Sequence, residues 1–262
     1  MGMGMRESAV LKKLRAGKLA SCVKLNSADP RIAELAALCG FDCVWTDMEH
    51  VANGYSAIES QIMAAKAGGA DCMVRVARGS YSDYVRPLEL DAAGIMAPHV
   101  MSLADARAIV RTTRFHPVGR RPLDGGNADA AYCLVDTPAY MAQANAQRFV
   151  VVQIEDPEPV EDEEELDSIA ALDGIDILFF GPGDFSQGIG DPCNFDNPRL
   201  KEVRAMVAKA AARHGKFAGT VGSIDNMGEL QEMGYRFVSV GADVVGLGQY
   251  FRQIADAFKR FQ

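Results

Sequence analysis

The sequence lacks the features that mark membrane-bound, secreted and lipidated proteins. No apolar run among its 262 residues is long enough to cross a bilayer. Residues 1–6 have no apolar core of the kind found in signal peptides, and residue 6 is Arg6 where a myristoylation site has Ser or Thr. We therefore expect a cytoplasmic protein with no membrane partner.

Basic charge is also scarce. The formal net charge is −8 at pH 7, which argues against nucleic acid as a partner because phosphate binding needs a basic face. It does not exclude a small anionic substrate, since one local arginine can override the overall sign. Hydrophobic residues make up 48% of the chain, which is typical of a globular protein.

Several familiar chemical motifs are missing. None of the six cysteines forms a C-x-x-C pair, so we expect buried free thiols, with a zinc site from Cys39 and Cys43 as a remote alternative. The glycine-rich segment 181–186 matches neither the dinucleotide-binding nor the P-loop pattern. No lysine at the end of a predicted strand stands out as a Schiff-base candidate, which argues against covalent catalysis through a lysine imine.

What the sequence does contain is a regular alternation of strand-like and helix-like segments. Short β-branched runs bounded by Gly or Asp alternate with segments that have apolar residues at i, i+3 and i+4. Eight such units predict a single (β/α)8 TIM barrel spanning residues 1–262. The predicted strands cover residues 19–25, 42–46, 72–76, 94–97, 149–154, 175–180, 217–221 and 237–240. The predicted helices cover residues 30–38, 56–67, 83–91, 103–113, 161–171, 198–214, 224–233 and 244–261.

Two carboxylates follow neighbouring predicted strands. Glu155 closes the run 149–154, and Asp184 follows the run 175–180. Parallel barrels place their chemistry at the carboxyl ends of the strands, and two carboxylates there suit a hard divalent cation. The alternative is a pair of solvated loop acids or helix caps.

Other strand ends supply a base and an anion-binding group. His50 follows a strand close to Asp47 and Glu49, which suits acid–base catalysis, although a structural histidine remains open. Arg75 ends an otherwise apolar strand and needs an anionic partner. That partner is either a substrate carboxylate or one of the two neighbouring acids.

Two long connections, residues 114–148 and 181–198, interrupt the regular alternation of predicted strands and helices. Loops of this length in a compact domain are usually functional or disordered.

Five segments together resemble the HpcH/HpaI aldolase family of metal-dependent, pyruvate-specific aldolases. The likeness runs from about Ala20 to Gly246, and the segments that carry it are residues 42–50, 74–76, 87–100, 153–155 and 181–186. The resemblance implies a barrel that is commonly hexameric and exchanges its C-terminal helix. It predicts a homo-oligomer with active sites between subunits.

The resemblance also implies roles for individual residues. Glu155 and Asp184 would bind Mg, Mn or Co, with Asp47 reaching the metal through water. Arg75 would hold the pyruvyl group and stabilise its enolate. The pocket for pyruvate would be lined by Gln153 and by the backbone around Gly183 and Asp184. His50 would be the acid–base group, oriented by Asp91.

Three departures from the family pattern stand out. Met48 replaces the usual Gly before the Glu-His pair, and Gly183 replaces the frequent Ala before the metal-binding Asp. The segment Gly119-Arg120-Arg121-Pro122 stands where a G-x-R-G pattern is common. The resemblance associates that segment with the entering aldehyde, so Arg121 is expected to contact substrate.

The expected function is reversible cleavage of a 4-hydroxy-2-oxo acid to pyruvate and an aldehyde, through a metal-bound pyruvate enolate. One alternative is decarboxylation of oxaloacetate or cleavage of an acyl-CoA by the same enolate chemistry. Another is a non-catalytic, ligand-binding barrel.

The position of Asp91 gives a topological prediction. Asp91 precedes the fourth predicted strand, near the amino-terminal face of the barrel, whereas His50 follows the second strand on the opposite face. If the family's His–Asp pairing holds, Asp91 must reach His50 from a neighbouring chain.

Overall fold

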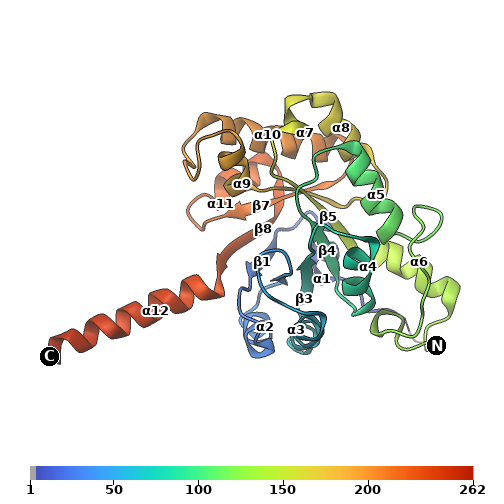
Figure 1. The fold of residues 1–262 in the computed structure, drawn as a ribbon, viewed down its shortest axis with the longest axis horizontal. Helices are drawn as coiled ribbons and strands as arrows, with labels where there is room; N and C mark the ends of the chain where they lie inside the picture. The colour runs from blue at the N-terminus through green and yellow to red at the C-terminus, as the bar shows by residue number, and fades with distance from the viewer. Residues whose placement is uncertain (1–3, 262) are drawn as a thin grey trace.

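Eight parallel strands close into a barrel in which the strand order follows the chain (Figure 1). The structure is a computed structural model that describes residues 4–261. The strands are β1 (Ala20–Lys24), β2 (Cys43–Asp47), β3 (Asp71–Arg75), β4 (Gly94–Ala97), β5 (Phe149–Ile154), β6 (Ile177–Phe180), β7 (Phe217–Gly222) and β8 (Tyr235–Ala242). The predicted (β/α)8 barrel is therefore confirmed.

Helices connect the strands and form the outer layer, as expected for parallel strands. Their bounds are α1 (Ala9–Arg15), α2 (Pro30–Leu38), α3 (Tyr55–Ala67), α4 (Tyr81–Glu89), α5 (Leu103–Thr113), α6 (Thr137–Gln147), α7 (Glu158–Glu161), α8 (Glu163–Ala171), α9 (Pro182–Gly188), α10 (Pro198–Arg213), α11 (Met227–Met233) and α12 (Asp243–Phe258). Two 3₁₀ turns are η1 (Ala128–Ala130) and η2 (Lys259–Phe261).

Apolar side chains fill both sides of the barrel wall. One cluster packs inside the barrel and includes Trp45, Phe149, Phe179 and Phe237, with α1 closing the amino-terminal end. A larger cluster fills the layer between the strands and the outer helices. The barrel interior is therefore a packed core, and ligands can enter only at its ends.

Strand register places polar residues side by side at the carboxyl ends. Asp47 pairs with Arg75 across β2 and β3. Lys24 pairs with Trp45 across β1 and β2, and with Ala242 across β1 and β8. The last residues of neighbouring strands thus meet at one rim of the barrel.

The connection from residue 114 to 148 contains more regular structure than its sequence indicated. It holds η1 and α6, and its own small core is built around Phe115 and Tyr140. It links α5 to the start of β5, so it lies toward the amino-terminal end of the barrel. The other long connection begins with the short helix α9, which starts directly after β6.

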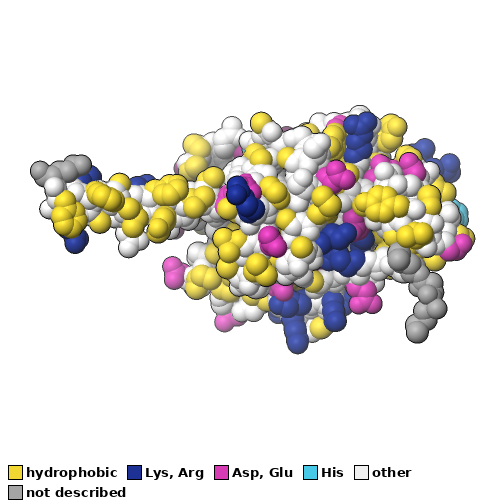
Figure 2. Space-filling view, turned by 90° about the horizontal axis from the view of Figure 1, so that it is seen from below, with side chains coloured by type: hydrophobic (Ala, Val, Ile, Leu, Met, Phe, Trp, Pro, Cys, Tyr) yellow, Lys and Arg dark blue, Asp and Glu magenta, His cyan; other side chains and the backbone are white. Residues whose placement is uncertain are grey.

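The last helix projects away from the barrel as an arm (Figure 1). None of the residues of α12 is buried. Large apolar side chains are nevertheless frequent on it, as the space-filling view of the arm shows (Figure 2). They include Val244, Leu247, Phe251, Ile254 and Phe258, which recur at the three- and four-residue spacing of one helix face.

Two smaller expectations concern membranes and cysteines. No helix within residues 4–261 has the length and apolarity needed to cross a bilayer. All six cysteines are free thiols, as predicted, but only Cys22, Cys43 and Cys72 are buried. Cys39 is exposed while Cys43 is buried, so the remote zinc alternative has no support from their positions.

Candidate active site

A cavity of about 270 Å³ opens at the carboxyl ends of the strands. Its lining includes Arg75, Gln153, Glu155, Gly183 and Asp184, so one cavity collects most of the residues singled out from the sequence. A larger hollow of about 710 Å³ lies on the flank between α5 and α8, and none of the predicted site residues lines it. The smaller cavity is therefore the candidate active site.

Asp47 is the centre of an ion-pair network on one side of this cavity. Its carboxylate accepts two hydrogen bonds from Arg75, Nε to Oδ1 at 3.1 Å and a terminal nitrogen to Oδ2 at 2.5 Å. Lys24 Nζ lies 2.9 Å from the same Oδ2. Burial alone would raise the pKa of Asp47, but the hydrogen bond and charge of Arg75, followed by those of Lys24, hold it well below its usual range.

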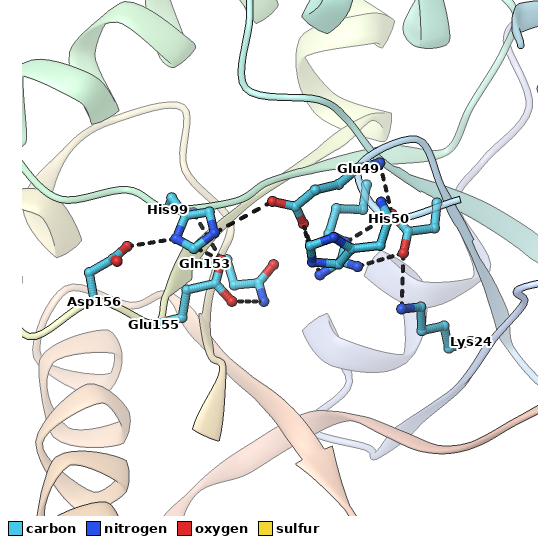
Figure 3. A network of polar contacts seen from close by, with 9 residues as sticks. Lys24, Glu49, His50, His99, Gln153, Glu155 and Asp156 are labelled. Atoms are coloured by element: carbon cyan, nitrogen blue, oxygen red, sulfur yellow. Dashed lines mark hydrogen bonds and ion pairs between the residues drawn. The ribbon is translucent and has the colours of Figure 1, made fainter. Parts of the chain in front are cut away.

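Glu49 connects this network to two histidines; the sequence named it as a possible partner of Arg75 but gave it no role at the site. Its carboxylate lies 3.0 Å from Arg75, 3.6 Å from His50 Nε2 and 3.6 Å from His99 Nε2. Figure 3 shows Glu49 between the two imidazole rings. The network thus extends from Lys24 through Arg75 to the loop that follows β4.

His99 joins the network to the second pair of acids. Its backbone N–H donates to Glu155 Oε1 at 2.9 Å, and its Nδ1 lies 3.0 Å from Asp156 Oδ2. His99 adopts a left-handed backbone with φ of 50°, which is uncommon for a residue other than glycine. Although burial opposes it, contact with Asp156 and the nearby acids raises the pKa of the His99 imidazole.

Glu155 and Asp184 lie on the side of the cavity formed by β5 and β6. Glu155 follows β5 and is almost fully buried, and Gln153 donates a side-chain hydrogen bond to it. Burial raises the pKa of Glu155 to about 7, and the nearby charges of Asp184 and Glu49 act in the same direction. Asp184 lies in the first turn of α9 and lines the same cavity.

These residues fit a divalent cation that is completed by other ligands. Burial and the repulsion between two nearby carboxylates both disfavour their charged forms. A cation placed between them would offset both effects and stabilise the charged carboxylates. The buried Gln153 Oε1 has no hydrogen-bond partner and is a third oxygen in the same region. No group of three or more His, Cys, Asp and Glu side chains within residues 4–261 could hold a metal by itself. Water or substrate would have to supply the remaining ligands.

Two predicted catalytic residues lie far apart within one chain. His50 is in the loop after β2 with its side chain 55% exposed, at the mouth of the barrel. Asp91 follows α4 near the opposite end, where it is buried in ion pairs with Lys66 and Arg148, the latter at 2.5 Å. The chain does not bring them together, so their pairing stays a prediction that requires a second chain.

Arg121 also lies outside the cavity of its own chain. It forms a buried ion pair of 2.7 Å with Asp129, and its guanidinium stacks on Phe115 at 4.7 Å from the ring centre. Tyr140 donates a hydrogen bond to the same Asp129 at 2.6 Å. These contacts give Arg121 a structural role in the 114–148 connection, and its contact with substrate stays a prediction.

Lys24 was missed by the sequence analysis. It is the last residue of β1 and lines the cavity together with Arg75 and Glu155, so a lysine does stand at a strand end. Its Nζ is held by the carboxylate of Asp47 at 2.9 Å, whereas a Schiff base requires an amine that is free to attack a carbonyl. Its place as the single charged residue in the predicted strand 19–25 was the signal available in the sequence.

Comparison with known proteins shows the family to which the chain belongs. The HpcH/HpaI aldolase/citrate lyase family matches residues 21–248. A hydroxypyruvate/pyruvate aldolase from Pseudomonas aeruginosa is 32% identical over 252 residues, which cover 95% of this chain and 91% of that protein. A 5-keto-4-deoxy-D-glucarate aldolase from Klebsiella pneumoniae is 30% identical over 89% of this chain and 90% of its own length.

A solved structure agrees with these sequence relatives. The crystal structure of an HpcH/HpaI aldolase from Desulfitobacterium hafniense superimposes with a TM-score of 0.89 and 30% identity, covering 95% of this chain and 96% of that one. The protein is therefore a member of the HpcH/HpaI aldolase/citrate lyase family, a family of lyases that act on carbon–carbon bonds.

Proposed function

We propose that the protein is a divalent-cation-dependent aldolase that interconverts a 4-hydroxy-2-oxo acid with pyruvate and an aldehyde. The observation that carries the proposal is the opposition of Glu155 and Asp184 to Arg75 across one cavity. A 2-oxo acid has a carboxylate and a keto oxygen on adjacent carbons, and this arrangement offers a cation site and a guanidinium to bind them. The two named aldolase relatives support the same chemistry.

A bound cation would supply Lewis acidity toward the keto oxygen. The chain's own contribution begins with Arg75, which is fixed by Asp47 and Glu49 and so needs little rearrangement when a substrate arrives. Its guanidinium is placed to stabilise negative charge that develops on the pyruvyl oxygens when the C3–C4 bond breaks. Gln153 and the backbone near Gly183 would orient the pyruvyl group.

The reaction also requires proton transfer at the C4 oxygen of the substrate. In the cleavage direction the C4 hydroxyl must lose its proton, and in the synthetic direction the aldehyde oxygen must gain one. His50 lies at the cavity mouth beside Glu49 and is the group that we assign to this step. Asp91 of a neighbouring subunit would orient it, in keeping with the opposite positions of the two residues in one chain.

The projecting arm supports an oligomer. An amphipathic helix with no buried residue leaves its apolar side chains in water, which is unfavourable unless a partner covers them. We assign the apolar face of α12 to a second copy of the chain, with exchanged helices and a hexamer as the assembly.

Two measurements test the proposed function. Pyruvate and a panel of aldehydes should give aldol products, identified by mass, only when Mg²⁺, Mn²⁺ or Co²⁺ is present, and a chelator should abolish them. Cation binding can be followed independently of activity through Trp45, the only tryptophan, which lines the cavity. Glu155→Gln and Asp184→Asn should abolish the fluorescence response to the cation, whereas the exposed matched control Glu164→Gln should retain it. Product formation that persists after chelation would contradict the proposal.

A further inference from the structure

A hollow of about 710 Å³ on the outer flank of the barrel has no part in the proposed reaction. It lies between α5 and α8, and no residue that lines the candidate active site also lines this hollow. Its charged lining consists of three arginines and one acid, Arg107, Arg111, Arg120 and Asp173. A chain with a net charge of −8 therefore gathers positive charge at one place on its surface.

The three arginines of this hollow have no acidic partners. Within residues 4–261 their guanidiniums form no ion pair and no side-chain hydrogen bond, whereas two arginines close to them in sequence do. Arg114 pairs with Asp176, and Arg121 pairs with Asp129. Neighbouring guanidiniums without acids between them repel one another, and a bound anion would relieve this repulsion.

The backbone brings the three arginines together from two segments. Arg107 and Arg111 are four residues apart in α5, so their side chains leave the helix on the same face. The backbone N–H of Arg120 donates to the carbonyl of Arg111 at 2.7 Å, which places Arg120 beside the end of α5. Gly119 permits this close approach, because a Cβ there would lie 2.5 Å from the carbonyl oxygen of Val110.

Both ends of the hollow are fixed by contacts of its walls. At one end the Glu165 carboxylate in α8 accepts a hydrogen bond from the N–H of Leu103, the first residue of α5, at 2.5 Å. At the other end Arg114 Nε donates to the carbonyl of Gly174 at 2.8 Å. A Cβ on Gly174 would lie 2.9 Å from a methyl group of Val118, so this end is closely packed. The hollow therefore needs little ordering when a ligand binds.

The remaining lining of the hollow is mostly apolar. A volume of about 710 Å³ lies in the usual range of about 300–1,000 Å³ for sites that bind small molecules. A free phosphate ion would contact only the arginines and leave the apolar wall in water. The lining thus fits a ligand with an anionic group and an apolar group. The apolar wall consists of Leu103, Val110, Pro117, Val118, Ala171 and Leu172.

We propose that this hollow binds an organic phosphate that carries at least two phosphate groups. The phosphates contact Arg107, Arg111 and Arg120, and the apolar part of the ligand lies against α5 and α8. Guanidiniums bind phosphate oxygens through paired N–H donors, and three of them match several negative charges better than a single carboxylate does. The inference is independent of the proposed function, because none of its residues takes part in the proposed reaction.

The test uses ADP as the probe, because ADP joins a diphosphate to a flat, largely apolar base. Its binding to the full-length, cation-free protein is measured by isothermal titration calorimetry. The absence of divalent cations prevents ADP from binding at the candidate active site through a metal. Pyrophosphate and adenosine, each tested alone, represent the two halves of the probe.

The variants replace the exposed arginines of the hollow with glutamine, singly and all three together. Circular dichroism checks that each variant is folded. Arg199→Gln is the matched control, since Arg199 is a partly exposed arginine that pairs with Glu202 and does not line the hollow. Arg75→Lys is a second control, which shows whether ADP uses the arginine of the candidate active site.

The wild type should bind ADP saturably with a Kd below about 1 mM, and pyrophosphate and adenosine at least about tenfold more weakly. Each single replacement should weaken ADP binding by about five- to tenfold, as expected for an exposed contact to a charged group, and the triple variant should abolish it. Both controls should bind ADP like the wild type. The inference would be overturned by a wild type that shows no saturable binding up to about 10 mM ADP, by a folded triple variant that binds as the wild type does, or by pyrophosphate that binds as tightly as ADP.

Discussion

Replacing Arg75 with lysine keeps the positive charge at the centre of the site but removes the planar guanidinium and its set of N–H donors. The Arg75 guanidinium makes two hydrogen bonds to Asp47 and lies 3.0 Å from Glu49, and its side chain is 4% exposed. A lysine ammonium at this position can reach one of these partners but cannot match the planar geometry. One or two buried carboxylate contacts are therefore lost, together with the second donor offered to pyruvate.

The expected cost follows from those contacts. A hydrogen bond to a charged group contributes about 1.5–3 kcal/mol, so the loss of two of them amounts to about 3–6 kcal/mol. If this loss falls on the transition state, kcat/KM for aldol cleavage should decrease by about two to four orders of magnitude. Lys24 still pairs with Asp47 in the variant, so folding should be affected less than activity.

The assay is steady-state cleavage of a 4-hydroxy-2-oxo acid, with released pyruvate measured at saturating Mg²⁺. Arg213→Lys is the matched control, since Arg213 pairs with Asp167 at 2.7 Å on the outer surface and does not line the candidate active site. We expect the control to stay within threefold of the wild type. If Arg75→Lys also retained activity within threefold, the assignment of Arg75 to enolate stabilisation would be refuted.

Three further predictions concern assembly and acid stability. Truncation after Ala242 removes the apolar arm and should reduce the oligomer mass measured by light scattering, whereas an unchanged mass would exclude exchange of α12. Mixing His50→Ala with Asp91→Asn chains should restore part of the activity, because some sites then contain both wild-type groups; no recovery despite proven subunit exchange would refute the pairing. Arg75 and Lys24 hold the pKa of Asp47 below its unfolded value near 4, so the carboxylate stabilises the fold above about pH 4 and this stabilisation is lost as the pH falls. Asp47→Asn should therefore flatten the decrease in unfolding free energy between about pH 5 and 3, and an unaltered pH profile would contradict this account.

Much of the barrel could be predicted because its signals are local. Each strand is a short apolar run, and each intervening segment shows helical periodicity. Helix α6 escaped detection because its sequence, TPAYMAQANAQ, mixes alanine with polar residues and buries only Tyr140 and Ala144. Helix α1 was missed although it closes the barrel, because it precedes the repeating units.

The parts of the site that were predicted are those set by strand ends. Asp47 and Arg75 end neighbouring strands, so their contact follows from the order of the strands. Glu49 and His99 could not be joined from the sequence, because their contact depends on how two loops fold over the barrel mouth. The role of Lys24 depended on register, which sets it beside Trp45 and within reach of Asp47.

The motif around Arg121 gave no information on where its side chain points. Within its own chain the side chain is buried against Asp129 and Phe115, and its contact with substrate stays a prediction. A subunit interface is invisible in a single sequence, because the residues that face each other belong to different copies. Asp91 is subject to the same limit.

The central claim, enolate chemistry on pyruvate with a divalent cation, is tested most directly by hydrogen exchange. Pyruvate is incubated with the protein in D₂O, and loss of the methyl proton signal is followed by NMR with Mg²⁺ and with a chelator. Our account predicts protein-catalysed exchange that needs the cation and that is lost in Glu155→Gln and Arg75→Lys. Exchange no faster than with the cation alone, or equal exchange in the presence of the chelator, would contradict it.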